Sequence, residues 1–275
     1  MIHFDHVSKT YPGGTTAVED FSLTVEQGST TVFLGTSGCG KTTLMRMVNA
    51  MVAPTSGRVF VRGRDVASED PVRLRRSIGY VLQEGGLFPH RTVADNVATI
   101  PRLEGATKQA SRERALELLD LVGLDRDMAD RYPAQLSGGQ RQRVGVARSL
   151  ANRADILLMD EPFGALDPIV RAELQRELKE IQRALGTTIL FVTHDVDEAF
   201  TLGDQVAVLS TGGHIEQVGT PAELLSSPAS PFVAEFVGAS RAARPVRVTG
   251  PGGLVVDDAG TPVGTLSLDE AGERP

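Results

Sequence analysis

The sequence is poor in cysteine and has no long apolar run. Cys39 is the single cysteine among 275 residues, which excludes a disulfide framework and a metal site built from cysteines. The longest apolar runs, such as Ile156–Met159, fall far short of the roughly 20 residues that a membrane-spanning helix needs. Met1–Thr10 has neither a basic stretch nor a long apolar stretch, so no signal peptide is predicted. If the protein acts at a membrane, we expect it to reach the membrane through a partner.

An excess of basic residues is also missing. The formal net charge is −7, which gives no support to a nucleic-acid partner. Arg73, Arg75 and Arg76 form a short basic cluster, which we interpret as a solvated face. With 41% hydrophobic and 23% charged residues, the composition is that of a globular protein of one or two domains with a full core.

The N-terminal part of the chain has the alternation of polar and apolar residues that is typical of strands. Residues 2–7 and 21–25 alternate on either side of a turn at Pro12–Gly14, which predicts an antiparallel sheet. Thr31–Leu34 predicts a buried strand, and a helix is expected after it, over about residues 40–51.

The remainder of the chain predicts an α/β fold with an insertion of helices. Residues 92–150 have helical spacing throughout, with a core-facing stripe made by Ala115, Leu118, Leu119 and Val122. Strands are predicted at 155–160, 188–193 and 206–209, and helices at 168–185 and 195–202. Alternating strands and helices predict a parallel sheet with helices on its faces.

The composition changes from about Gly238 onward, where alanine, glycine, proline and serine become frequent. Residues 253–264 predict two short strands around an Asp-Ala-Gly turn. The stretch is too short for a domain with its own core, so residues 239–275 are predicted to be a short, partly ordered appendage.

Residues 35–42 match the phosphate-binding pattern G-x-x-x-x-G-K-[ST] at every fixed position. Glycines allow backbone N–H groups to curl around a phosphate, and the helix that follows adds its positive end. Lys41 is expected to hold the β- and γ-phosphates, and Thr42 to place its hydroxyl on Mg²⁺. Cys39 is interpreted as a small packing residue. The predicted nucleotide contacts of this loop are Gly35, Thr36, Ser37, Gly38, Cys39, Gly40, Lys41, Thr42 and Thr43.

Two carboxylates end the apolar strand predicted at 155–160. A strand end beside the phosphate loop is where a metal-binding aspartate belongs, so Asp160 is expected to hold Mg²⁺ through water. Glu161 could then polarise the attacking water as a general base. Acidic residues at strand ends are otherwise commonly only solvated, but the upstream loop and Pro162 favour the functional interpretation.

Residues 136–140 read Leu-Ser-Gly-Gly-Gln, and here the chain resembles the ATPases of ABC transporters, for which this pentapeptide is the signature motif. Ser137 could alternatively be only a helix cap. The resemblance covers about residues 1–238 and implies a P-loop ATPase with a mixed core sheet, an N-terminal antiparallel β-subdomain and a helical insertion at about 92–150. It also implies that two copies pack head to tail, each ATP lying between the phosphate loop of one subunit and Ser137, Gly138, Gly139 and Gln140 of the other.

The resemblance assigns roles to four further residues. Tyr11 stands where an aromatic ring stacks on adenine, and Gln83 matches the glutamine that senses Mg²⁺ and faces the permease. Asp167 matches the D-loop that touches the other subunit. His194 matches the switch histidine on the γ-phosphate, so Glu161, His194 and Gln83 form the predicted catalytic set and Thr42, Gln83 and Asp160 the predicted metal set.

Within the family, residues 70–76, 78–83, 86–90 and 159–168 are similar to those of importers of quaternary-ammonium osmoprotectants (glycine betaine, carnitine, choline, proline betaine). Thr36 departs from that subfamily, which usually has proline there. Relatives often carry a pair of CBS regulatory domains after the ATPase, whereas here Leu254–Ser267 resembles one strand-turn-strand piece, which we interpret as a degenerate remnant. With no tryptophan and three tyrosines, the chain offers no aromatic cage for the solute, so recognition must lie in a permease or a binding protein.

The resemblance predicts a peripheral bacterial subunit on the cytoplasmic face of the cell membrane, bound to integral-membrane permease subunits and served indirectly by a substrate-binding protein. Three alternatives stay open: an importer of another small solute such as an amino acid, a soluble ABC-type ATPase acting on DNA or ribosomes, and a nucleotide-binding regulator without hydrolysis. The single cassette without sustained heptads argues against the second, and the presence of Glu161 and His194 argues against the third.

Overall fold

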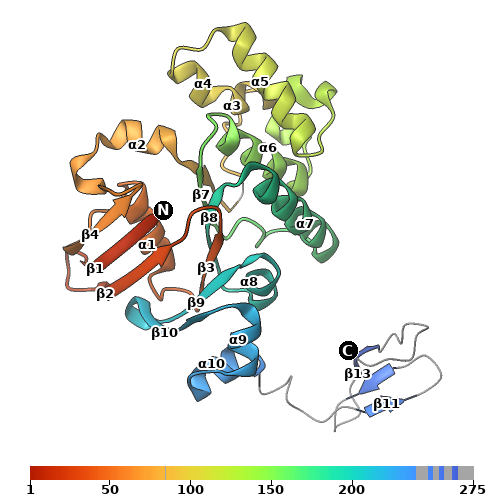
Figure 1. Cartoon of the computed structure of the whole chain (residues 1–275). Coiled ribbons are helices and arrows are strands. Elements are labelled where there is room, and N and C mark those ends of the chain that lie inside the picture. The colour runs from red at the N-terminus through yellow and green to blue at the C-terminus, as the bar shows by residue number, and fades with distance from the viewer. Residues whose placement is uncertain (84, 240–246, 250–253, 257–261, 266–275) are drawn as a thin grey trace. The chain divides into compact units, whose positions relative to one another are not determined.

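A computed structural model of the chain describes residues 1–83, 85–239, 247–249, 254–256 and 262–265 (Figure 1). The chain divides into two compact units, Met1–Pro221 and Ala222–Pro275. In the described part, no helix is both long enough and apolar enough to cross a membrane. The first unit contains all the residues that the sequence assigns to nucleotide chemistry.

The first unit begins with the predicted antiparallel sheet, whose strand order is β2-β1-β4-β5. These strands are β1 (Ile2–Thr10), β2 (Thr16–Val25), β4 (Ser56–Val61) and β5 (Arg64–Asp65). The predicted turn at Pro12–Gly14 joins β1 to β2, and there the Gly14 N–H donates to the Tyr11 carbonyl at 3.0 Å. Phe4 and Phe21 project from this sheet and meet edge to face, with ring centroids 5.2 Å apart.

The second sheet is mixed and has the strand order β10-β9-β3-β8-β7-β6. Its strands are β3 (Thr30–Gly35), β6 (Gly79–Val81), β7 (Ile156–Asp160), β8 (Thr188–Thr193), β9 (Gln205–Ser210) and β10 (His214–Gly219). All neighbouring strands run parallel except β10, which is antiparallel to β9. Because parallel strands end at the same edge of a sheet, the residues that follow β3, β7 and β8 are brought together.

Helix α1 (Lys41–Val48) and the antiparallel sheet share one hydrophobic core with the mixed sheet. Alternate residues of the mixed sheet, such as Phe33, Leu158 and Leu190, belong to this core and are fully buried. On the intervening positions, Phe191 packs near Phe163, with ring centroids 5.8 Å apart. A sheet buried on both faces needs nearly continuous apolar strands, which explains the runs at 156–159 and 189–192.

Residues 92–150 are helical, as the sequence spacing predicts, but turns divide the segment into several helices. The segment is divided into α3 (Val93–Val97), α4 (Thr99–Leu103), α5 (Lys108–Leu121) and α6 (Gly138–Leu150), with 3₁₀ turns at Arg126–Asp130 and Pro133–Gln135. Thr107 caps α5 and Ser137 caps α6, so each helix starts where a hydroxyl accepts a bond from a free N–H. Figure 1 shows α3, α4 and α5 gathered at one end of the unit. The predicted stripe from Ala115 to Val122 is buried.

The remaining helices of the first unit are α2 (Pro71–Ser77), α7 (Pro168–Leu185) and α8 (Val196–Leu202), with 3₁₀ turns at Val66–Ser68 and Thr211–Gly213. Helix α9 (Pro221–Ser226) begins at the boundary of the units, and α10 (Pro231–Phe236) lies in the second.

The second unit also contains a small antiparallel sheet of β11 (Arg247–Thr249), β12 (Leu254–Val256) and β13 (Pro262–Thr265). Strands β12 and β13 coincide with the two strands predicted at 253–264. The Asp-Ala-Gly turn predicted between them lies outside the described residues.

Candidate active site

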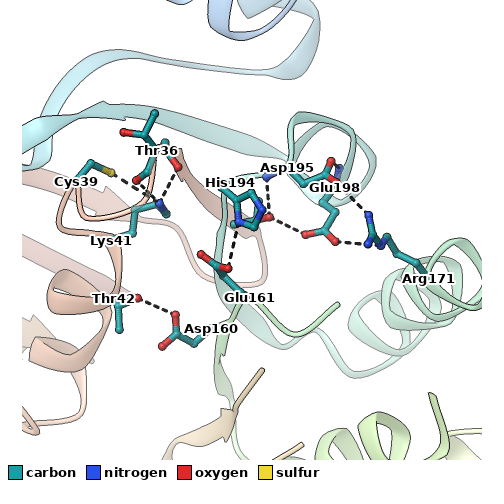
Figure 2. Close-up of polar contacts among 12 residues, drawn as sticks. Thr36, Cys39, Lys41, Thr42, Asp160, Glu161, Arg171, His194, Asp195 and Glu198 are labelled. Atoms are coloured by element: carbon teal, nitrogen blue, oxygen red, sulfur yellow. Dashed lines mark hydrogen bonds and ion pairs between the residues drawn. The ribbon is translucent and has the colours of Figure 1, made fainter. Parts of the chain in front are cut away.

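The phosphate-binding pattern forms the loop between β3 and α1. Gly40 stands before α1 with φ +110°, and a Cβ atom there would lie 2.5 Å from the Ala17 carbonyl oxygen, so only glycine fits. Lys41 is 4% exposed, and its ammonium donates to the carbonyls of Gly35 at 2.7 Å and Thr36 at 2.8 Å (Figure 2). The loop therefore holds the lysine charge among its own carbonyls, where an anion could replace them.

Cys39 belongs to this loop, and its side chain is buried. Its Sγ atom lies 3.8 Å from Lys41 Nζ, and its carbonyl accepts a hydrogen bond of 2.7 Å from the Gly213 N–H. Cys39 is also a member of the hydrophobic core around α1. These contacts agree with a packing role for the thiol.

The residues predicted to hold Mg²⁺ meet at the end of β7. Thr42 Oγ1 donates to Asp160 Oδ1 at 2.9 Å, and the Tyr80 hydroxyl donates to Asp160 Oδ2 at 3.3 Å. Gln83 lines the same open hollow as Thr42, Asp160 and Glu161. Hydroxyl, carboxylate and amide oxygens are suitable ligands for a hard cation, and Mg²⁺ commonly takes one or two protein oxygens besides phosphates and water. These residues therefore fit the ion.

Tyr80 was not singled out from the sequence, although it lies in β6, only three residues before Gln83. Burial raises the pKa of its hydroxyl, and the negative charge of Asp160 raises it further. At neutral pH Tyr80 is thus a hydrogen-bond donor that fixes the orientation of the Asp160 carboxylate.

Glu161 and His194 face each other across the ends of β7 and β8. Glu161 Oε2 lies 3.1 Å from His194 Nδ1, and the Glu161 N–H donates to the Val192 carbonyl at 2.9 Å (Figure 2). The backbone of Glu161 has φ +46°, a conformation that non-glycine residues rarely adopt. Strained backbone of this kind is often found where a side chain must be aimed at a reacting group.

Two hollows meet over these residues. One is lined by Ala17, Ser37, Gly38, Gly40, Lys41, Thr42, Thr43 and Glu161. The other is lined by Thr42, Arg46, Leu82, Gln83, Gly86, Asp160 and Glu161. Because Thr42 and Glu161 belong to both, the phosphate loop, the metal residues and the candidate base form one open site.

Tyr11 lies beside the phosphate loop, with its hydroxyl 3.5 Å from Thr43 Oγ1. The ring is partly exposed, and Lys9 Nζ lies 5.2 Å from its centroid. An exposed aromatic ring next to the loop has the position needed for stacking on a base.

The Leu-Ser-Gly-Gly-Gln segment is the start of α6. The Ser137 hydroxyl accepts from the Gln140 N–H at 3.2 Å, and Gln140 Oε1 accepts from the Ser137 N–H at 2.9 Å. This reciprocal arrangement is a capping box, so the cap that the sequence offered as an alternative is present. Among the described residues, no hydrogen bond or ion pair joins Ser137 or Gln140 to the phosphate loop or to Asp160.

Asp167 lies before α7 and caps it, accepting from the Val170 N–H at 3.0 Å. Gly139 packs against the start of the same helix, where a Cβ atom on it would lie 2.6 Å from Val170 Cγ1, and a Cβ atom on Gly138 would lie 3.4 Å from the Leu166 side chain. The predicted signature and D-loop residues of one chain are thus neighbours of each other.

Comparison with known proteins shows to which family these motifs belong. The profile of the ABC transporter family matches residues 18–164, which contain the phosphate loop, Gln83, the pentapeptide, Asp160 and Glu161. This chain belongs to the ABC transporter family. The predicted fold class is confirmed by a solved structure, the dimeric ATP-binding cassette MJ0796 in a post-hydrolysis state bound to ADP and phosphate. It has a TM-score of 0.73 and 32% identity over 80% of this chain and 99% of that one.

Two curated relatives of this family member carry different solutes in their names. The glycine betaine/carnitine/choline transport ATP-binding protein OpuCA of Bacillus subtilis is 51% identical over 241 residues, which are 88% of this chain and 63% of that protein. The spermidine/putrescine import ATP-binding protein PotA of Thermobifida fusca is 49% identical over 242 residues, which are 87% of this chain and 62% of that protein. The chain thus spans less than two thirds of the length of both relatives.

Proposed function

We propose that this chain is the ATP-hydrolysing subunit of an ABC importer. The observation that carries the proposal is the convergence of Lys41, the Thr42–Asp160 pair and the Glu161–His194 pair on one open site. In this proposal residues 1–238 are the ATPase domain, with the helical insertion at 92–150 and the appendage at 239–275.

The proposed chemistry assigns one task to each group. Lys41 and the loop N–H groups bind the β- and γ-phosphates, and Thr42, Asp160 and Gln83 hold Mg²⁺, which when bound neutralises charge on the phosphate oxygens. Glu161 accepts a proton from the attacking water. His194, whose Nδ1 atom lies 3.1 Å from the Glu161 carboxylate, orients that group and faces the γ-phosphate.

We further propose a head-to-tail homodimer in which Ser137–Gln140 completes the site of the partner subunit. In one chain this segment makes no hydrogen bond to the phosphate loop among the described residues, and the Ser137 hydroxyl is accessible. The relative MJ0796 was solved as a dimer. A start of α6 that faces a second nucleotide would use its free N–H groups and helix dipole on the γ-phosphate.

The segment after Gln83 is the proposed contact with membrane-embedded permease subunits, which would hold this chain at the cytoplasmic face of the membrane. Phe88 in this segment is 40% exposed, and Leu82 just before Gln83 is 37% exposed, as expected of an apolar contact surface. Hydrogen bonds hold this segment in place. Arg148 donates to the Gly85 and Gly86 carbonyls at 2.8 and 2.7 Å. The side-chain amide of the fully buried Asn96 accepts from the Phe88 N–H and donates to the Phe88 carbonyl.

For the solute we propose quaternary-ammonium osmoprotectants, delivered to the permease by a binding protein. The support is the name of the Bacillus subtilis relative together with the subfamily resemblance of residues 70–76, 78–83 and 86–90. The polyamine relative is almost as similar, so another small solute, including an amino acid, is the second candidate.

The test compares Glu161→Gln with Glu180→Gln, an equal change at an exposed position on α7. Purified Glu161→Gln should bind ATP, lose hydrolysis by roughly a hundredfold or more, and form an ATP-dependent dimer by light scattering, whereas Glu180→Gln should behave as wild type. Equal hydrolysis in both variants would overturn the catalytic assignment.

An uptake measurement in cells then tests the proposed solute. Labelled glycine betaine uptake after osmotic upshift should be lost only with Glu161→Gln. Unchanged uptake, with hydrolysis lost in the purified protein, would assign the ATPase to another solute.

A further inference from the structure

A polar cluster flanks His194 in the chain, and its members Thr193 and Glu198 are buried. Thr193 Oγ1 donates to Glu198 Oε2 at 2.7 Å and accepts from the Asp195 N–H at 3.0 Å. Asp195 Oδ1 accepts from the N–H groups of Asp197 and Glu198 at the start of α8. The residues on both sides of His194 are therefore fixed by hydrogen bonds to α8.

Arg171 joins this cluster to the D-loop. Its Nη1 atom donates to Asp195 Oδ2 at 3.1 Å, and its Nη2 atom donates to the Leu166 carbonyl at 3.2 Å (Figure 2 shows the side chain pointing from α7 toward Asp195 and Glu198). Leu166 immediately precedes Asp167. One guanidinium thus touches the residue after His194 and the residue before Asp167.

The shape of the guanidinium is essential to this bridge. It is planar and presents several donors in fixed directions, whereas a lysine ammonium is a single compact charge on a flexible chain. Arg171 Nε also lies 3.7 Å from Glu198 Oε1, and Glu198 is only 3% exposed. A neighbouring cation stabilises the charged form of a buried carboxylate, so the bridge also has a stabilising role that a lysine could retain.

The same end of α7 contacts the signature segment, because Gly139 packs closely on Val170. The first turn of α7 is therefore in contact with the segment proposed to reach the partner's nucleotide, and Arg171 connects that turn to the loop of His194.

We propose that Arg171 is a positioning residue that makes the Leu166–Asp167 segment and the His194–Asp195 segment move as one unit. The inference rests on the proposed function, in which Asp167 faces the partner subunit and His194 faces the γ-phosphate. Arg171 then links the His194 loop at one ATP site to the Asp167 segment, which faces the partner subunit and its ATP site.

The bridge is tested first without nucleotide, by hydrogen–deuterium exchange of the full-length protein. Arg171→Lys keeps a cation beside Glu198 but cannot reach Leu166 and Asp195 together. Exchange should become at least about twofold faster both in peptides that cover 162–167 and in peptides that cover 194–199. Arg176→Lys is the matched control, since Arg176 is exposed on the same helix, and it should change neither. Faster exchange in only one of the two segments, or in none, would overturn the bridge.

The second arm measures steady-state hydrolysis. Arg171→Lys should lower kcat roughly tenfold while ATP affinity and the thermal midpoint stay near the wild-type values. Asp195→Asn keeps the oxygen that caps α8 and removes the charged acceptor, so it should give a similar loss. The double variant should be no worse than the singles, because both remove one bridge.

Additive losses, or an unchanged kcat in Arg171→Lys, would overturn the positioning role. If the wild-type protein hydrolysed no ATP, the proposed function would fall, and the exchange measurement would still decide the bridge.

Discussion

Helices α1 and α6 both begin with a glycine-rich motif, but the polar groups at the two helix starts have different partners. At the start of α1 the loop encloses Lys41 and connects Thr42 to Asp160, so the groups proposed to bind phosphate and metal are already in place. At the start of α6, Ser137 and Gln140 use their polar groups on each other.

The difference follows from what each helix start must do in an isolated chain. A loop that binds phosphate within its own subunit can be built in advance. A segment whose ligand is proposed to arrive with another subunit needs an internal cap until then, because free N–H groups at a helix start are otherwise left to water. The comparison predicts that a substitution at the start of α1 weakens ATP binding by a single subunit. A substitution at the start of α6 should have an effect only in the dimer.

The largest effect is expected from Lys41→Ala. In the proposed site the ammonium makes two charge-assisted hydrogen bonds to phosphate, worth about 3 kcal/mol together, so without them ATP affinity should fall about a hundredfold or more. Ser137→Ala, measured by the same calorimetric titration on the monomer, should stay within about twofold of wild type. Equal losses in the two variants would mean that both motifs serve the nucleotide within one chain.

A mixture of the two variants sharpens the comparison. In a head-to-tail dimer, one Lys41→Ala subunit and one Ser137→Ala subunit combine both defects in one site and leave the other site intact. Prepared in the Glu161→Gln background with different tags, the mixture should show more ATP-dependent co-purification than either variant alone. If the mixture is no better than the separate variants, the two motifs do not meet across an interface.

The sequence predicted the phosphate loop at the start of α1 better than it predicted the structure around that loop. The phosphate loop is contiguous, and the strands that carry Asp160 and His194 are recognisable as apolar runs whose ends must meet in a parallel sheet. The residues 2–7 and 21–25 likewise fall in the paired strands β1 and β2.

Features that depend on distant partners were missed. β10 is half-buried from its second residue to its last and shows no alternation, so only its pairing with β9 reveals it as a strand. The helical segment 92–150 is broken by turns that its periodic spacing hides. Arg171 could not be singled out because its partners, Leu166 and Asp195, come together only when α7 packs beside α8.

The capping box itself should have a measurable stability. Ser137→Ala removes the acceptor of the Gln140 N–H, which should lower the free energy of unfolding by about 1 kcal/mol. Urea unfolding measures this, and Ser137→Asp should recover most of the loss because a carboxylate also caps a helix start. The absence of any loss in Ser137→Ala would show that water caps α6 equally well, and the contrast with α1 would then be one of function alone.

The smallest effect concerns pH and the α1 side, where the Tyr80 hydroxyl donates to Asp160. The pKa of Tyr80 is raised above the ordinary value of 10.0 by burial and then by Asp160. A group whose pKa is raised by folding stabilises the folded state fully below its unfolded pKa, and this contribution is lost as pH rises through the folded pKa. The wild-type protein should therefore lose stability above about pH 10 relative to Tyr80→Phe, by less than about 1 kcal/mol because the side chain is partly exposed. Urea unfolding of both proteins from pH 8 to 11 measures the difference. Parallel curves would mean that the Tyr80–Asp160 bond adds nothing to the folded state, and the metal side of the site would then be held by Thr42 alone.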